Sequence, residues 1–324
     1  MFIDSALVAP PEAEPARASA IISSFADALT RRSIELAIRE LGTPPCPFTW
    51  IALGSHGRRE PLPGSDVDSA LAWDGDEGDR EARSYMLALG SRVSEQLARR
   101  GLVPDERGAT AARDLFVRPV SDWRRLIRES IDDPRADKGL VVISLFLDGR
   151  VLHQGGAAPD FDRELGAACG RRGVLRLMLS QALANRSASG RLRGFIVESS
   201  GEHRGFLDIK HGGLLPITSI ARYGSLAAGT TAPSSTPERL SAAETAGTLD
   251  SRSAHALRDA FDLFQAVRLD HQVQQVRSGF DPDDHLDPNA LEPARRRLLR
   301  DALREVKAVQ KRLSRQLSGE IAFA

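Results

Sequence analysis

The feature that most constrains the fold is the segment of residues 50–73, WIALGSHGRREPLPGSDVDSALAW. One apolar run ends at Gly54-Ser55, a charged turn with two prolines follows, and a second apolar run begins after an Asp-Val-Asp sequence. Apolar runs bounded by glycine and proline predict two buried strands, over residues 48–53 and 66–73. The connection is too short for a full crossover helix, so we expect two adjacent strands with at most one or two helical turns between them.

The polar residues of this segment suit the transfer of a nucleotidyl group. Asp66 and Asp68 are two residues apart on the predicted strand, so their carboxylates point to one face, with Cα atoms about 6.5 Å apart. Such carboxylates offer the hard oxygen ligands that Mg²⁺ (or Mn²⁺) takes in phosphoryl transfer. Gly54 allows the backbone to approach a phosphate closely, and Ser55 offers a hydroxyl and an amide at an expected helix start.

Other interpretations of these residues stay open. Arg58 or Arg59 either neutralises a phosphate or orients Glu60. A Ser-Asp-x-Asp turn alone is more often a solvated strand entry, and the glycine and lysine spacing of a Walker-type loop is absent. The two features together, placed between two apolar runs, favour a nucleotidyltransferase site.

We expect the remainder of the chain to divide into a part with both helices and strands and a part that is mainly helical. Helical spacing of apolar residues predicts helices over residues 14–41, 81–100, 122–131, 138–147, 160–169, 172–187, 214–227, 237–248, 251–278 and 289–318. A third strand is expected within residues 111–120, and residues 206–213 are expected to be extended and then to turn. We therefore expect three parts: a loose amino-terminal tail within 1–19, an α/β (α+β) domain over 20–155 and a mainly α-helical domain over 156–324.

The composition limits which binding partners and which cellular compartment we expect. The 44 Lys and Arg residues balance 44 Asp and Glu residues, so no overall field recruits nucleic acid or an anionic membrane. Two cysteines cannot build a disulfide framework, which favours a reducing compartment. The first residues lack the basic start and apolar core of a signal peptide, and no stretch has the composition of a membrane span. We therefore expect a cytoplasmic protein.

Two blocks of the sequence carry a resemblance to a known family. Gly54-Ser55-His56-Gly57-Arg58-Arg59-Glu60, followed by Ser65-Asp66-Val67-Asp68, resembles the signature of the polymerase-beta-like nucleotidyltransferase superfamily. The form is that of bacterial PII uridylyltransferase and of the signal-transduction nucleotidyltransferases often found with CBS or cyclic-nucleotide-binding domains. The block LDIKHGGLLPI at 207–217 is similar to the carboxy-terminal substrate-binding domain of that family. The resemblance covers roughly residues 20–318.

This resemblance implies an activity and a set of site residues. It implies Mg²⁺-dependent transfer of a nucleoside monophosphate, uridylyl or adenylyl, from a nucleoside triphosphate to a hydroxyl of a protein, with release of pyrophosphate. Asp66 and Asp68 would bind the metal. The implied contacts to the nucleotide are Gly54, Ser55, Arg58, Ser65, Lys210, Gly212 and Gly213. Two alternatives stay open: modification of a small molecule, as in aminoglycoside nucleotidyltransferases, or a silent nucleotide-binding regulatory module.

The sequence departs from the family pattern in two respects. The accompanying regulatory domains do not occur in it, so ligand sensing is expected to belong to a separate protein or to be absent. The segment 108–114, GATAARD, differs from the usual version, which contains Asn-Pro. Asp114 is the candidate for the third carboxylate and metal ligand of the superfamily. The alternative is a surface aspartate that pairs with Arg113.

Several other features are set aside. The seven histidines are scattered without metalloprotease-like spacing. Among them His211 is placed near the site, whereas His56 is expected to be a solvent-facing turn residue. The acidic run 281–285, DPDDH, lacks the glycine and glutamate of an EF-hand and is interpreted as a helix connection. The basic residues between 295 and 304 are interpreted as a solvated helix face.

Overall fold

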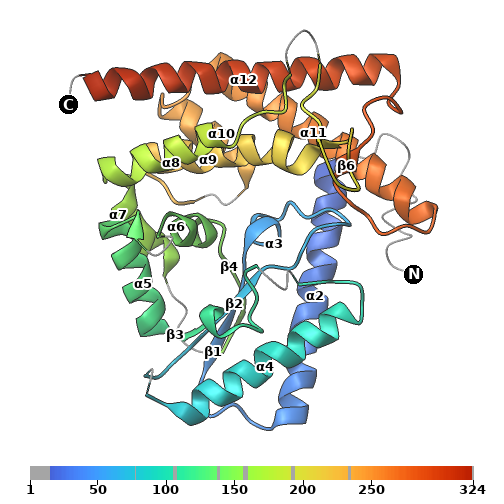
Figure 1. Ribbon diagram of the computed structural model, residues 1–324. Coiled ribbons are helices and arrows are strands. Elements are labelled where there is room, and N and C mark those ends of the chain that lie inside the picture. The colour runs from blue at the N-terminus through green and yellow to red at the C-terminus, as the bar shows by residue number, and fades with distance from the viewer. Residues whose placement is uncertain are drawn as a thin grey trace. The chain divides into compact units, whose positions relative to one another are not determined.

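The computed structural model describes residues 15–76, 78–104, 108–136, 139–155, 160–190, 194–232 and 235–322 (Figure 1). The chain divides into two compact units, one of residues 19–167 and one that contains residues 168–324 together with the start of the first helix. The predicted tail before residue 15 lies outside the described residues. Residues 15–19, also assigned to that tail, form the first turns of a helix.

The unit of residues 19–167 has a small sheet with helices around it. Its elements in chain order are α2 (Pro15–Leu41), β1 (Phe48–Ala52), α3 (Gly54–Arg58), β2 (Ser69–Trp73), α4 (Arg80–Ala98), η1 (Asp114–Phe116), β3 (Val117–Pro119), α5 (Val120–Asp132), α6 (Gly139–Leu147), β4 (Arg150–Gln154) and α7 (Phe161–Cys169). The sheet order is β3-β2-β1-β4. β1 runs antiparallel to β2 and β4, whereas β2 and β3 are parallel.

The alternation of side chains along the strands explains how helices cover this sheet. One face carries Trp50 of β1 together with Leu71 and Trp73 of β2, and these pack in one buried cluster with apolar residues of α2 and α4. On α5, Trp123 is buried, and its Nε1 donates to Leu71 O at 3.0 Å. Figure 1 shows α4 lying across the strands and α5 beside β3.

The three predicted strands are confirmed, and each is shorter than expected, β1 by one residue. β2 begins at Ser69 rather than at residue 66. The third strand contains only Val117–Pro119, because Asp114–Phe116 form a 3-10 turn that interrupts pairing with β2.

The unit of residues 168–324 is mainly helical. Its elements are α8 (Arg172–Ala184), β5 (Leu207–Asp208), the π-helical turn η3 (Lys210–Leu214), α9 (Leu215–Ala227), α10 (Thr236–Thr245), α11 (Ser251–Arg277), β6 (His285–Leu286) and α12 (Pro293–Ala322). Apolar residues of α8 to α12 form one large buried cluster. The predicted fold class, a mixed domain followed by a helical one, is confirmed. Within the described residues, no helix has the length and apolarity needed to cross a membrane.

A tight contact between α4 and the segment after it gives a stability prediction. A Cβ atom on Gly90, in the middle of α4, would lie 1.8 Å from the carbonyl oxygen of Ala111. In an open helix, Gly→Ala stabilises by about 1 kcal/mol. At Gly90 the backbone clash reverses the sign, and we expect Gly90→Ala to lower the free energy of unfolding by at least about 2 kcal/mol.

Urea unfolding followed by tryptophan fluorescence measures this effect, because Trp50, Trp73 and Trp123 all lie in the unit of residues 19–167. Gly166→Ala in α7 is the matched control, since a Cβ atom there meets nothing within 4 Å. That variant is expected to be as stable as the parent or slightly more stable. Equal effects at both glycines would contradict the close approach of α4 to Ala111.

Candidate functional site

The end of β1 and the start of β2 lie side by side because the strands pair in antiparallel register. Ala52 pairs with Ser69, and Leu53 N donates to Asp68 O at 3.0 Å. The chain then turns at Gly54, whose φ of +56° lies in the left-handed region that favours glycine. A Cβ atom on Gly54 would lie 2.2 Å from Asp68 Oδ2. The carboxylate of Asp68 therefore occupies the space that any side chain at position 54 would fill.

Asp66 and Asp68 flank a buried residue just before β2. Val67 is buried, whereas both aspartates are half-buried. Ser69, which pairs with Ala52 of β1, also donates from its N to Ala109 O at 2.8 Å, so the start of β2 is bonded to the segment that precedes β3. Burial alternates across Asp66, Val67 and Asp68, as is expected of extended backbone. The strand itself starts at Ser69, and the common orientation of the two carboxylates stays a prediction.

The two serines of the signature occupy turns. Ser55 is half-buried in the first turn of α3, and its carbonyl oxygen accepts from Glu60 N at 2.9 Å. Ser65 closes the next turn, because its hydroxyl accepts from Leu62 N at 2.9 Å and its own N–H donates to Leu62 O at 2.9 Å. Ser65 thereby fixes the backbone that leads into Asp66.

Arg58 lies between two acidic side chains in the interior of the unit. Its Nε donates to Glu60 Oε2 at 2.7 Å, and its Nη1 donates to Asp148 Oδ2 at 2.5 Å. Burial alone would lower the pKa of Arg58, but the two carboxylates more than reverse this and raise it. Of the two alternatives for the arginines, the structure thus shows Arg58 orienting Glu60. Its neighbour Arg59 is exposed, with a left-handed φ of 61°.

The prediction that His56 faces solvent is wrong. His56 is 3% exposed, and it forms a hydrogen bond to the backbone of Ser65. Its carbonyl oxygen accepts from Arg150 Nη2 at 3.1 Å, and Arg150 also binds both carboxylate oxygens of Asp27. Burial lowers the pKa of His56 to about 4, so the ring is neutral near pH 7. His56 links the turn after β1 to the turn before Asp66.

The buried imidazole makes the stability of this unit depend on pH. The pKa of His56 is about 4 in the folded chain and 6.5 as its ordinary value, so the unfolded chain binds more protons between these values. Stability is therefore expected to fall as the pH is lowered from 6.5 to 4, by up to about 3 kcal/mol from this group. Urea unfolding at several pH values, followed by tryptophan fluorescence, is expected to show a shallower pH dependence for His56→Gln. An unchanged slope would show that His56 is not the group responsible.

Asp114, the candidate third carboxylate, forms an ion pair on the surface. Its Oδ2 lies 2.5 Å from Arg83 Nη2 of α4, and both side chains are about half exposed. With Trp73, the last residue of β2, these two residues line a shallow hollow. Among the residues that the structure describes, Asp114 does not form a group with Asp66 and Asp68 whose ligand oxygens all lie within 4.8 Å. Its role as the third metal ligand stays a prediction.

Within the block of residues 207–217, Lys210–Leu214 form the π-helical turn η3, in which both glycines pack closely. A Cβ atom on Gly212 would lie 2.5 Å from the Cβ of Ala188. A Cβ atom on Gly213 would lie 3.0 Å from Cδ2 of the buried Phe264. The lack of room for a Cβ atom therefore explains why this turn contains glycine at both positions.

Lys210 and His211 extend from this turn toward carboxylates. Lys210 Nζ lies 3.9 Å from Asp284 Oδ2, with 40% of the side chain exposed. His211 Nδ1 lies 2.7 Å from Asp208 Oδ2, and this hydrogen bond raises the pKa of His211. The block therefore presents two groups able to carry positive charge at the surface of the helical unit.

Sequence reasoning missed how the histidines gather. His203, His211, His271 and His285 lie far apart in the sequence, yet each lies within hydrogen-bond or ion-pair range of an aspartate or stacks on another of the four. The β5–β6 pairing and the turn after α11 bring them together. Spacing along the chain carries no signal for such a cluster, because its members come from separate turns.

Comparison with known families identifies both parts of the chain. Residues 6–137 match the family model described as "Putative nucleotidyltransferase DUF294". Residues 172–317 match the model described as "Putative nucleotidyltransferase substrate binding domain". A search of the curated proteins found no match. The two models follow each other in the order that the resemblance implied and together span most of the sequence. The chain therefore belongs to the nucleotidyltransferase family that these two models describe and carries the substrate-binding domain of that family.

Proposed function

We propose that the unit of residues 19–167 transfers a nucleoside monophosphate from a nucleoside triphosphate to a hydroxyl and releases pyrophosphate. The observation that carries this proposal is the contact between Gly54 and the carboxylate of Asp68. The turn at Gly54, which is suited to close approach of a phosphate, therefore lies next to Asp68 of the acidic pair Asp66 and Asp68, which is suited to a metal. The match to the nucleotidyltransferase family supports the same reaction.

Asp66 and Asp68 fit a hard divalent cation, Mg²⁺ or Mn²⁺. Both are half-buried on either side of the buried Val67, and carboxylate oxygens together with substrate phosphates are the ligands that Mg²⁺ prefers. When bound there, the ion would neutralise phosphate charge and align the reacting oxygens. Asp114 stays the candidate for a third ligand, and its ion pair with Arg83 would have to open for that role.

The surrounding residues would bind the triphosphate and hold the turn. Gly54 and Ser55 would contact phosphate through the backbone and the hydroxyl. Arg58 would act indirectly, by holding Glu60, because its charge is already matched by two carboxylates. The exposed Arg59 is the better candidate to neutralise a phosphate directly.

The acceptor is proposed to be a protein hydroxyl, as the resemblance to PII uridylyltransferase and the signal-transduction enzymes implies. Lys210 of the substrate-binding domain is proposed to contact the nucleotide, since its ammonium group is partly exposed. Gly212 and Gly213 would support that contact by allowing η3 to pack closely.

Labelled substrates test the proposal. The full chain is incubated with each of the four α-labelled nucleoside triphosphates, Mg²⁺ or Mn²⁺, and cell extract. Label on a protein band supports the proposed reaction, whereas label only on small molecules supports the aminoglycoside type of acceptor. Nucleotide binding without any transfer, with all four nucleotides and both metals, would show that the chain is a silent binding module.

A further inference from the structure

The short β-ladder of the helical unit has a cluster of histidines and aspartates around it. Asp208 of β5 lies opposite His285 of β6 in the register. His203 comes from the turn before β5, which is closed by a hydrogen bond from Glu198 N to Phe206 O at 2.9 Å. These contacts hold separate parts of the chain at one place.

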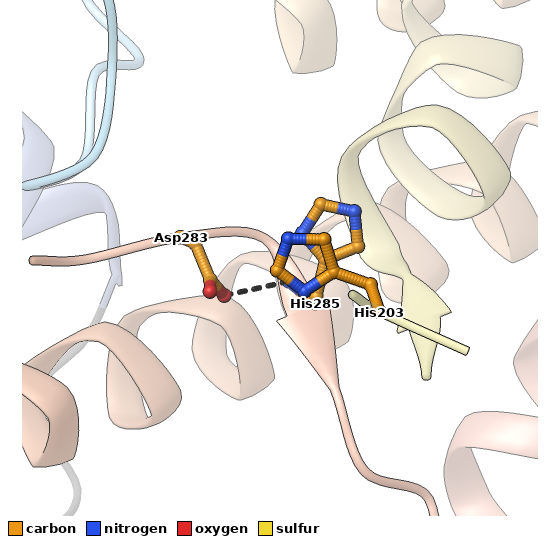
Figure 2. Close-up of side chains that lie close together, drawn as sticks. All are labelled: His203, Asp283 and His285. Atoms are coloured by element: carbon orange, nitrogen blue, oxygen red, sulfur yellow. Dashed lines mark hydrogen bonds between the residues drawn. The ribbon is translucent and has the colours of Figure 1, made fainter. Parts of the chain in front are cut away.

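Three of the side chains meet closely enough to share one cation. Within the described part of the chain, His203, Asp283 and His285 are the group whose ligand atoms all lie within 4.8 Å of one another. Figure 2 shows the two imidazole rings face to face, with the Asp283 carboxylate beside them. The ring centroids are 3.6 Å apart and the ring planes differ by 5°. All three residues are half-buried, so a bound ion would be partly shielded from water.

The two nitrogens of His285 have the environments expected for a metal ligand. Its Nδ1 is buried and has no hydrogen-bond partner. Its Nε2 lies 3.9 Å from Asp208 Oδ2. A buried polar atom without a partner costs free energy, and a cation would use its lone pair. Metal-bound histidines characteristically donate their second ring N–H to a carboxylate or a carbonyl oxygen, and Asp208 is the carboxylate near Nε2 of His285.

Asp283 is held in place by hydrogen bonds. Its Oδ1 accepts from the backbone N of His285 at 2.9 Å and lies 3.0 Å from His271 Nε2. Its own N–H donates to Gln275 Oε1 at 2.9 Å. The carboxylate is therefore held in place near the two imidazoles.

We propose that His203, Asp283 and His285 bind a divalent transition-metal ion of the zinc type. Two imidazoles and one carboxylate are a ligand set that Zn²⁺ takes, whereas Mg²⁺ prefers oxygen ligands alone. Because a metal binds the lone pair in the plane of each ring, the His203 ring has to turn out of the stack when the ion binds. The ion would then tie the turn of residues 198–206 to β6.

Co²⁺ titration of the full chain tests this site. The parent carries Asp66→Asn and Asp68→Asn, so that the acidic pair of the other unit does not contribute. Visible absorption of bound Co²⁺ is expected to saturate at one equivalent, and Zn²⁺ is expected to displace the Co²⁺. His203→Gln, Asp283→Asn and His285→Gln are each expected to weaken binding at least about tenfold. His255→Gln, an exposed histidine on α11, is the matched control and is expected to bind like the parent.

The outcomes separate this proposal from the one on nucleotidyl transfer. Failure to bind one equivalent of Co²⁺ or Zn²⁺ would overturn the site, as would equal affinity in the parent and in two of the three ligand variants. Circular dichroism confirms that each variant is folded before its affinity is compared. Transfer is measured in parallel on His203→Gln alone, where normal labelling is expected. Absence of label transfer by the wild-type chain would therefore contradict the proposed role of Asp66 and Asp68. Absence of Co²⁺ binding would contradict the proposed site at His203, Asp283 and His285.

Discussion

Replacing Asp66 or Asp68 by Asn is expected to lower the rate of nucleotidyl transfer by on the order of 10²- to 10³-fold. Each substitution keeps the shape of the side chain and removes the negative charge that would hold the cation. The Asp68 carboxylate lies against Gly54, so the loss of charge would occur where the phosphates approach. Initial rates of label transfer at saturating triphosphate measure the effect, and tryptophan fluorescence confirms that the unit is folded.

Two further carboxylates make this prediction specific. Asp76→Asn changes an exposed aspartate after β2 and is expected to transfer label like the wild type. Asp114→Asn decides the third ligand: a loss comparable to that of Asp68→Asn assigns Asp114 to the metal, and normal rates assign it to the ion pair with Arg83. Full activity in both Asp66→Asn and Asp68→Asn would contradict the proposed metal site.

Replacing Arg58 by Met is expected to cost about 3–5 kcal/mol of unfolding free energy. The side-chain volume is similar, but Glu60 and Asp148 would be left in the interior without their shared cation. Burying an unpaired charge costs more than the ion pair itself contributes, which makes the loss large. Urea unfolding followed by tryptophan fluorescence reports the stability of this unit.

The matched control is Arg59→Met, the neighbouring arginine, whose side chain is 55% exposed and lies 3.9 Å from an Asp27 oxygen. It is expected to change stability by no more than about 0.5 kcal/mol. Adding Asp148→Asn to Arg58→Met is expected to recover part of the lost stability, because it removes one of the two carboxylate charges that Arg58 had matched. Equal losses at both arginines would show that the ion pairs of Arg58 are not what stabilises the turn.

The parts of the site that depend on neighbouring residues in sequence were predictable. The two strands, the turn between them and the Asp66–Asp68 alternation follow from a single apolar pattern interrupted by glycine, proline and charge. Pairing of adjacent strands over a short connection then leaves few alternatives for where Asp68 lies. The family resemblance extended this prediction to the second domain, and the family models agree with it.

The parts that depend on distant residues were not predictable from local patterns. His56 is buried because Arg150 and Asp27, from other elements, close over its helix. Arg58 is matched by Asp148, which belongs to the turn after α6. Local composition marked both residues as polar turn positions, since no pattern in the sequence shows which segment will pack against them. The histidine cluster of the helical unit escaped notice for the same reason.

Two hydrogen bonds of Ser69 connect the segment 108–114, which departs from the family pattern, to the residue that directly follows Asp68. Ser69 N donates to Ala109 O, and Ser69 Oγ accepts from Ala111 N at 3.1 Å. Because Ser69 directly follows Asp68, a change in bulk or backbone at Ala109 or Ala111 would shift the carboxylate without replacing it. Divergence of this segment would therefore change the position of the Asp68 carboxylate in the proposed site while the signature residues stay the same.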